Sequence, residues 1–205
     1  MITQNTYKVC RRLGAGMFDK CQTQKFAVSE ARHAKNSKKR RATVSNFSKQ
    51  LFEKQRVRFA YGITERQLRR IVEEANRVAL LGKDPSERMI VRIEMRLDNI
   101  IYRTGLASSR RAARQLVSHG HVLVNGVRTT IPSHTLIEGD TFTLRERTRA
   151  LPIMAHIEEA WNNATLPVWL SYDPKSYTGT VKARPTVENT EMVGSVSAIL
   201  EYYSR

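Results

Sequence analysis

The stretch RRAARQLVSHGHVLVNG (Arg110–Gly126) joins a predicted helix directly to the first strand of a predicted hairpin. On a helical wheel, the apolar side chains of residues 110–118 lie on one side and the polar side chains lie on the other, as in a helix that packs on a core. The strand that follows alternates valines with other residues and ends at Asn125-Gly126, a pair typical of a type I′ turn. The stretch therefore predicts a small helix-and-hairpin element, with three guanidiniums exposed beside the edge of the hairpin: Arg110, Arg111 and Arg114.

The residues just before this stretch predict the helix on which it packs. The segment DPSERMIVRIEMRLDNIIYRTG (Asp84–Gly105) begins with Asp84 as N-cap and Pro85 at the first helical position, and its apolar residues keep helical spacing almost to Gly105. We expect a break near Glu94 to divide it into two helices. We expect Ser108 or Ser109 to cap the arginine-bearing helix that follows.

Shorter elements are predicted on both sides. Upstream, a helix is expected in Ser45–Gly62, starting at Ser45 or Ser48, and another in Thr64–Gly82, where Thr64 and Gln67 form a capping box. Downstream, residues 127–147 are rich in β-branched side chains and predict short strands. The last segments predict one helix in PIMAHIEEAWNN and short strands in PVWLSYD, GTVKARP and SAILEYYS. The pattern as a whole predicts an α+β protein.

Positive charge is the main compositional signal. The 205 residues include 35 Lys and Arg against 19 Asp and Glu, for a formal net charge of +16. Residues 1–83 contain 20 of these basic residues and only 6 acidic ones, so nearly all the excess lies in the first two-fifths of the chain. A field of this sign favours polyanions, with nucleic acid ahead of an anionic membrane surface.

The first 45 residues show little apolar periodicity and end in the basic run ARHAKNSKKRRAT (Ala31–Thr43). Such a run repels itself in water, so we expect it either to form a disordered tail or to become ordered on nucleic acid. No apolar run approaches the length needed to span a bilayer, and the N-terminus has no apolar signal-peptide core. We therefore expect a soluble, intracellular protein without a membrane partner. Two cysteines are too few for a disulfide framework.

A longer segment around the opening stretch resembles a known RNA-binding module. The segment RLDNIIYRTGLASSRRAARQLVSHGHVLVNGVRTTIPSHTLIEGD (Arg96–Asp140) carries the sub-motifs of the small module first named after the fourth small-subunit ribosomal protein, in the same order. The segments QLFEKQRVRFAYGITERQLRRIVEEA upstream, PVWLSYD downstream and the closing EYYSR are similar to the ribosomal protein family itself, of bacterial type. The resemblance runs from about Arg11 to Arg205.

This resemblance implies a domain plan. It implies a basic N-terminal arm (residues 1–45), which is extended, and a mostly helical domain (46–93, completed by 186–205). Inserted in that domain is a module of two packed helices on a short antiparallel sheet, with a following helix and strands (94–185).

The resemblance also implies a function. It implies a cytoplasmic, ribosome-associated component of the small ribosomal subunit, from a bacterial or an organellar ribosome. Such a protein binds the 5′ domain of small-subunit rRNA and nucleates assembly. Its partners would be this rRNA, neighbouring small-subunit ribosomal proteins, and mRNA near its entrance.

Other classes of protein stay open. The same module occurs in free RNA-binding and RNA-modifying factors, and a membrane-surface protein would also be basic.

The tripeptide Arg96–Asp98 looks like the catalytic aspartate motif of pseudouridine synthases, but here it opens the module, so we expect Asp98 to cap or pair within its helix. We therefore predict no enzymatic activity.

No cofactor or metal is predicted. Cys10 resembles the last part of a Cys-x-x-Cys motif of zinc-binding members. With Cys21 and His33, it makes at most three ligands where structural zinc normally takes four.

The predicted RNA contacts are basic side chains, because arginine forks in particular suit phosphate oxygens. They are Arg11, Arg12, Lys38, Lys39, Arg40, Arg41, Lys49, Lys54, Arg56, Arg58, Arg66, Arg69, Arg70, Arg103, Arg110, Arg111, Arg114, His119, His121 and Arg128.

Overall fold

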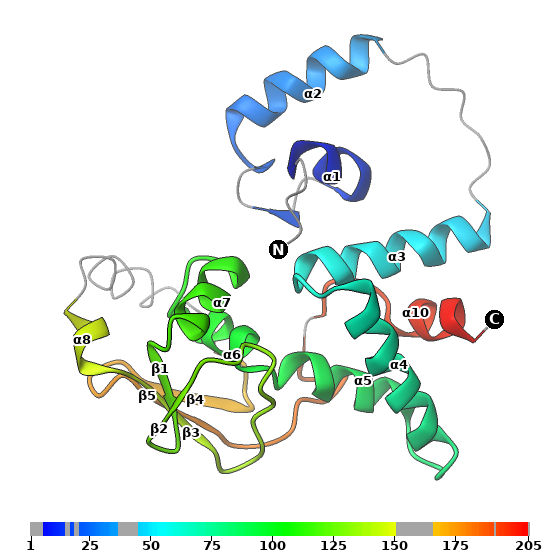
Figure 1. Cartoon of the computed structure of the whole chain (residues 1–205). Coiled ribbons are helices and arrows are strands. Elements are labelled where there is room, and N and C mark those ends of the chain that lie inside the picture. The colour runs from blue at the N-terminus through cyan, green and yellow to red at the C-terminus, as the bar shows by residue number, and fades with distance from the viewer. Residues whose placement is uncertain are drawn as a thin grey trace. The chain divides into compact units, whose positions relative to one another are not determined.

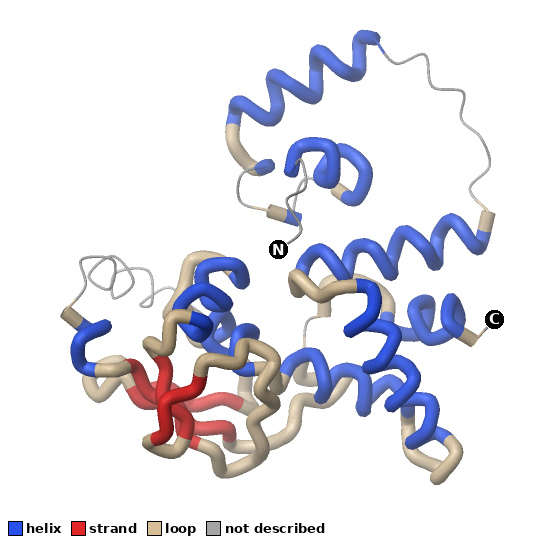
Figure 2. The backbone as a smooth tube through the Cα atoms, viewed as in Figure 1, coloured by secondary structure: helices blue, strands red, loops and turns tan. Residues whose placement is uncertain are grey.

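The computed structural model describes residues 6–14, 17–18, 21–36, 45–150, 166–190 and 192–204. Contacts divide the chain into two compact units, one formed by Met1–Glu65 with Val193–Arg205 and the other by Arg66–Met192. The described elements are helices and one antiparallel sheet (Figures 1 and 2), so the predicted α+β class is confirmed. The division at Glu65 differs from the predicted boundary at residue 93.

The sheet lies in the second unit and has five strands. Its order is β2-β1-β3-β5-β4, and every neighbouring pair is antiparallel. The strands are β1 (Val122–Val124), β2 (Val127–Thr129), β3 (Thr141–Leu144), β4 (Leu170–Asp173) and β5 (Thr178–Val181). Strands predicted in PVWLSYD and GTVKARP are therefore present as β4 and β5.

The turn between β1 and β2 has the geometry that its sequence predicts. Val124 pairs with Val127, and the two residues between them, Asn125 and Gly126, have φ of 49° and 80°. Positive φ at both positions is what a type I′ turn requires. The Asn125 side chain also fixes the hairpin to β3, because its Oδ1 accepts from Thr141 N at 2.9 Å and its Nδ2 donates to Asp140 Oδ1 at 2.8 Å.

The helices of the second unit begin mostly where capping residues predict. Asp84 accepts from Ser86 N and Ser109 accepts from Ala112 N, so both caps are confirmed, and the break near Glu94 separates two helices as expected. The helices are α4 (Glu65–Ala79), α5 (Pro85–Glu94), α6 (Leu97–Arg103), α7 (Arg110–Ser118) and the short α8 (Glu146–Arg149). The predicted helix in Pro152–Asn163 lies outside the described residues.

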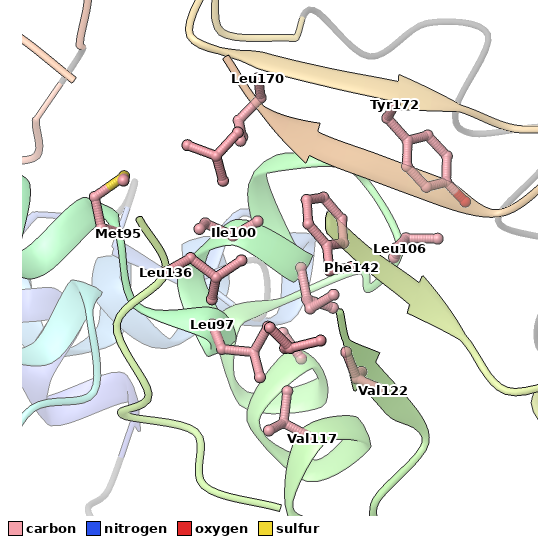
Figure 3. Packing of buried hydrophobic residues seen from close by; sticks show 14 of the residues in the cluster. Met95, Leu97, Ile100, Leu106, Val117, Val122, Leu136, Phe142, Leu170 and Tyr172 are labelled. Carbon is pink, nitrogen blue, oxygen red and sulfur yellow. The ribbon is translucent and has the colours of Figure 1, made fainter. Parts of the chain in front are cut away.

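The core of this unit lies between α6, α7 and the sheet. Figure 3 shows side chains from both layers meeting there, among them Leu97 and Val117 from the helices and Val122 and Phe142 from the strands. All four are fully buried. The loop that contains Pro132 lies against the start of α6, because the Pro132 carbonyl accepts a hydrogen bond from Asp98 N at 3.1 Å.

The first unit contains α1 (Thr6–Leu13), α2 (Gln24–Asn36), α3 (Asn46–Ala60) and α10 (Val196–Tyr203). The N-cap of α3 is Ser45, one of the two predicted starts. The last element was predicted wrongly, because SAILEYYS forms the helix α10 rather than a strand. Ser195 caps this helix, Ile199 is fully buried and α10 packs on α3, so tertiary contacts override the strand preference of its aromatic residues.

The N-terminal region also differs from the prediction of an extended arm, since helices occupy 6–13 and 24–36. A disulfide joins Cys10 to Cys21, and a small apolar cluster surrounds it. In this cluster the rings of Tyr7 and Phe26 pack edge to face, with their centres 5.3 Å apart. This local cross-link and cluster order a segment whose charge pattern alone predicted no core.

The described residues lack two further features. None of their helices is both long enough and apolar enough to cross a membrane. Within the same residues, no group of three or more His, Cys, Asp or Glu side chains is placed to hold a metal ion.

Candidate nucleic-acid interface

The arginines of α7 do not all face outward, which corrects the prediction from the helical wheel. Arg111 is exposed, but Arg114 turns towards α6, where its Nε and Nη2 donate to Asp98 Oδ2 at 3.0 and 2.8 Å. The buried Arg96 donates to both oxygens of the same carboxylate at 3.0 and 2.8 Å. The predicted pairing of Asp98 within its helix is therefore confirmed for Arg96, the N-cap of α6, whereas the pair with Arg114 of α7 was not predicted.

Arg110 also contacts α6, and Arg103, the last residue of α6, contacts the end of α5. Arg110 Nε donates to Asn99 Oδ1 at 2.9 Å, and its guanidinium lies 4.3 Å from the centre of the Tyr102 ring. Arg103 donates two hydrogen bonds to the carboxylate of the fully buried Glu94, from Nε at 3.1 Å and from Nη2 at 2.9 Å. A helical wheel of α7 alone cannot show the contacts of Arg110 and Arg114, because their acceptors lie on α6, 11 and 16 residues earlier in the chain.

A second group of predicted residues meets at the end of the hairpin. The rings of His119 and His121 have their centres 6.1 Å apart, and Arg128 Nη2 donates to the carbonyl of His119 at 3.3 Å. Gly120 allows this approach, because a Cβ there would lie 2.2 Å from Arg128 Nε and because its φ is +73°. Arg145, the residue before α8, also contacts this loop, because its Nη1 donates to the carbonyl of Gly120 at 3.5 Å. We call His119, His121, Arg128 and Arg145 the hairpin-end cluster.

Three arginines at the start of α8 and within it were not predicted from the sequence. Arg145, Arg147 and Arg149 line a recess of about 350 Å3 together with Leu123, Leu144 and Glu146. Arg149 is partly engaged, since its Nε donates to the carbonyl of Leu144 at 3.0 Å. The alternation Arg-x-Arg-x-Arg directly after a strand was the available signal for this site.

The predicted residues of α4 are exposed. Arg66 and Arg70 carry no ion pair among the described residues, whereas Arg69 pairs with Glu73 at 3.0 Å, four residues further along the same helix. A surface pair of this kind is weak and does not prevent Arg69 from contacting a polyanion.

On α3 the structure separates structural cations from exposed ones. Lys54 is buried, where its Nζ donates to Glu65 at 2.7 Å and lies 4.3 Å from the centre of the Tyr202 ring. Arg58 Nη1 reaches the other oxygen of Glu65 at 3.3 Å. The burial of Lys54 therefore conflicts with the prediction that it contacts RNA. Its positive charge instead pairs with Glu65 within the first unit.

The remaining predicted residues of this unit lie nearer the surface. Lys49 and Arg12 are exposed and line one recess of about 1330 Å3 with apolar side chains of α1 and α3. Arg56 pairs with Glu53 at 3.1 Å, and Arg11 donates to the carbonyl of Tyr7 at 3.2 Å. The predicted run of Lys38, Lys39, Arg40 and Arg41 lies outside the described residues.

The stability of the first unit should fall in acid because of Glu65. Burial raises the pKa of this carboxyl, but hydrogen bonds from Lys54, Tyr203 and Arg58 outweigh it, so the pKa lies below its ordinary value of 4.5. A lowered carboxyl pKa contributes stability above the ordinary value, and this contribution is lost as pH falls through the lowered one. Thermal melts from pH 7 to pH 3 should show a smaller decline for Glu65→Gln than for the unchanged chain. An equal decline in both would contradict this account.

Known proteins are similar to this chain over nearly its whole length. A family model described as the ribosomal protein S4/S9 N-terminal domain matches residues 1–94, and one described as the S4 domain matches residues 95–142. The small ribosomal subunit protein uS4 of Roseiflexus sp. (strain RS-1) is 39% identical over 202 residues, which are 97% of this chain and 96% of that protein. The chain belongs to the ribosomal protein S4 family. The resemblance seen in the sequence is therefore confirmed.

Other S4 relatives agree in extent. The uS4 protein of Thermotoga petrophila is 39% identical over 203 residues, and the uS4A protein of Clostridium botulinum is 38% identical over 207 residues, covering 99% of this chain and 98% of that protein. The S4-domain match starts at the junction of α5 and α6 and ends in β3. It contains the Asp98 pairs and three members of the hairpin-end cluster, whereas Arg145 and α8 lie beyond it.

Proposed function

We propose that this chain is a structural component of the small ribosomal subunit that binds small-subunit rRNA. The observation that carries the proposal is the likeness to uS4 proteins at 39% identity over 97% of the chain. The net charge of +16 and the exposed basic side chains of α4, α7 and the hairpin end support it physically.

We extend the proposal to the finer role that the family resemblance implies. The chain would bind the 5′ domain of the rRNA, nucleate assembly, contact neighbouring ribosomal proteins and lie near the mRNA entrance. The plan of a basic arm (1–45), a helical domain (46–93 with 186–205) and an RNA-binding module (94–185) is part of this proposal. The side chains that we propose to face the RNA are exposed: Arg66, Arg69, Arg70, Arg111, His119 and Arg128. A second group is oriented by hydrogen bonds inside the module: Arg103 by Glu94, Arg110 by Asn99 and Arg114 by Asp98.

Cosedimentation tests the proposal at the level of the ribosome. Native lysate is separated on a sucrose gradient after a high-salt wash, and the chain is followed by immunoblot. We expect it in the small-subunit peak. Its appearance only among free proteins, with an intact small-subunit peak beside it, would overturn the proposal.

Removing exposed charges should change how RNA affinity depends on salt. Each phosphate contact that is lost should lower the slope of log affinity against log salt concentration by about 0.7–1, so Arg111→Gln with Arg128→Gln should lower it by about 1.4–2. The matched control is Lys182→Gln with Arg184→Gln, which removes two charges from exposed positions of the same unit after β5. Equal slopes for the two double variants would show that Arg111 and Arg128 lie on a merely solvated surface.

A further inference from the structure

His121 is held firmly at the centre of the hairpin-end cluster. Its Nδ1 lies 2.9 Å from the hydroxyl of Thr148, which is only 1% exposed, and its carbonyl accepts from Arg145 N at 3.0 Å. The ring therefore has a fixed position between β1 and α8. The hydroxyl of Thr148 can donate to a neutral ring or accept from a protonated one, so this contact fits both states of the imidazole.

The titratable and charged side chains around this ring are all basic. They come from every element that packs against it: His119 from the end of α7, Arg128 from β2 and Arg145 from the start of α8. Burial and then these three neighbours lower the pKa of His121 below 6.5, so the ring is neutral at pH 7. The one carboxylate of α8, Glu146, is exposed and lines the neighbouring recess.

The two arginines of the cluster keep donors for a ligand. Among the described residues, Arg128 and Arg145 each make one side-chain hydrogen bond, and in both cases the acceptor is a backbone carbonyl. A guanidinium has five N–H donors, and its planar fork suits the oxygens of a phosphate. The cluster therefore combines unused donors with a positive field that no carboxylate among its members balances.

We propose that His121, Arg128 and Arg145 form a binding site for one RNA backbone phosphate, and that His121 takes up a proton from solvent when this phosphate binds. The proposal rests on the RNA-binding function proposed above and adds a proton to it. The phosphodiester keeps its single negative charge throughout, and no covalent bond forms or breaks. The anion offsets the repulsion from His119, Arg128 and Arg145, so the protonated ring becomes favourable, and Thr148 accepts its Nδ1–H.

The affinity for RNA should therefore depend on pH. Binding that takes up one proton gains up to about tenfold in affinity for each unit by which pH falls between the pKa values of the bound and the free ring. We expect the full chain to bind a small-subunit rRNA fragment about tenfold more tightly at pH 6 than at pH 8, at constant ionic strength. His121→Gln should lose most of this dependence, so that its affinity changes little between pH 8 and pH 6, whereas the control His134→Gln, at an exposed loop position, should keep it.

Nuclear magnetic resonance of the histidine rings gives a second measurement. The pKa of His121 in the full chain should rise on addition of the rRNA fragment. A rise with inorganic phosphate but not with RNA would overturn the assignment to an RNA phosphate. An unchanged pH dependence in His121→Gln would overturn the proton uptake, and this result differs from failure of the function itself, in which RNA binding is absent at every pH.

Discussion

Replacing Phe142 with alanine should lower the free energy of unfolding of the second unit by about 3–5 kcal/mol. Phe142 is fully buried on β3, the middle strand of the sheet, and its ring lies between the helices and the strands (Figure 3). Its removal leaves a cavity that the surrounding helices and strands can only partly fill. Val127→Ala is the control, because Val127 is 68% exposed on the edge strand β2 and should change stability by less than about 0.5 kcal/mol. Urea titrations of both variants measure the difference.

A partner substitution makes this prediction more specific. The Phe142 ring covers Gly179 of β5 so closely that a Cβ there would lie 2.2 Å from its Cζ. Gly179→Ala alone should therefore cost about 1–3 kcal/mol through overpacking. In the Phe142→Ala background the clash disappears, so the double variant should be more stable than the sum of the single effects predicts. Simple additivity would show that the ring does not occupy the space above Gly179.

The sequence predicted the module well because its signals are local. Caps at Asp84 and Ser109, the break near Glu94 and the turn at Asn125 each depend on a few neighbouring residues, and the structure confirms all four. The C-terminal segment failed for the opposite reason. Nothing local in SAILEYYS reveals that α3 lies beside it, and this contact favours a helix.

The candidate interface was predicted at the level of charge but not of direction. Basic composition and the family resemblance identified the residues, yet only the structure shows that Lys54 and Arg114 pair with carboxylates while Arg111 is exposed. Arg145 was missed because it follows a strand and becomes part of the site only when α8 folds back beside His121. The identity of a side chain predicts its charge, whereas its direction depends on partners that lie far away in the sequence.

Replacing Glu94 with alanine should be about as damaging as removing Phe142, although Glu94 is charged. Its carboxylate is fully buried and accepts from Arg103 twice and from Asn99 Nδ2 at 2.6 Å. Removing one member of a buried pair leaves the other charge uncompensated, which typically costs about 3–5 kcal/mol. Asn99 would also lose the acceptor of its Nδ2. Because Asn99 Oδ1 accepts from Arg110, the position of Arg110 would then be less well fixed. Urea titration of Glu94→Ala measures the loss.

A double substitution separates the structural role of this pair from its role at the interface. Glu94→Leu with Arg103→Met replaces both charges by apolar side chains of similar size, and such replacements are often neutral or stabilising. We therefore expect the double variant to recover most of the stability that Glu94→Ala loses. If Glu94 also orients Arg103 and Arg110 towards phosphates, affinity for the rRNA fragment should stay reduced in the refolded double variant, with a lower salt slope. Full recovery of both stability and affinity would mean that the buried carboxylate serves the fold alone, and that the arginines on this side of the module do not contact RNA.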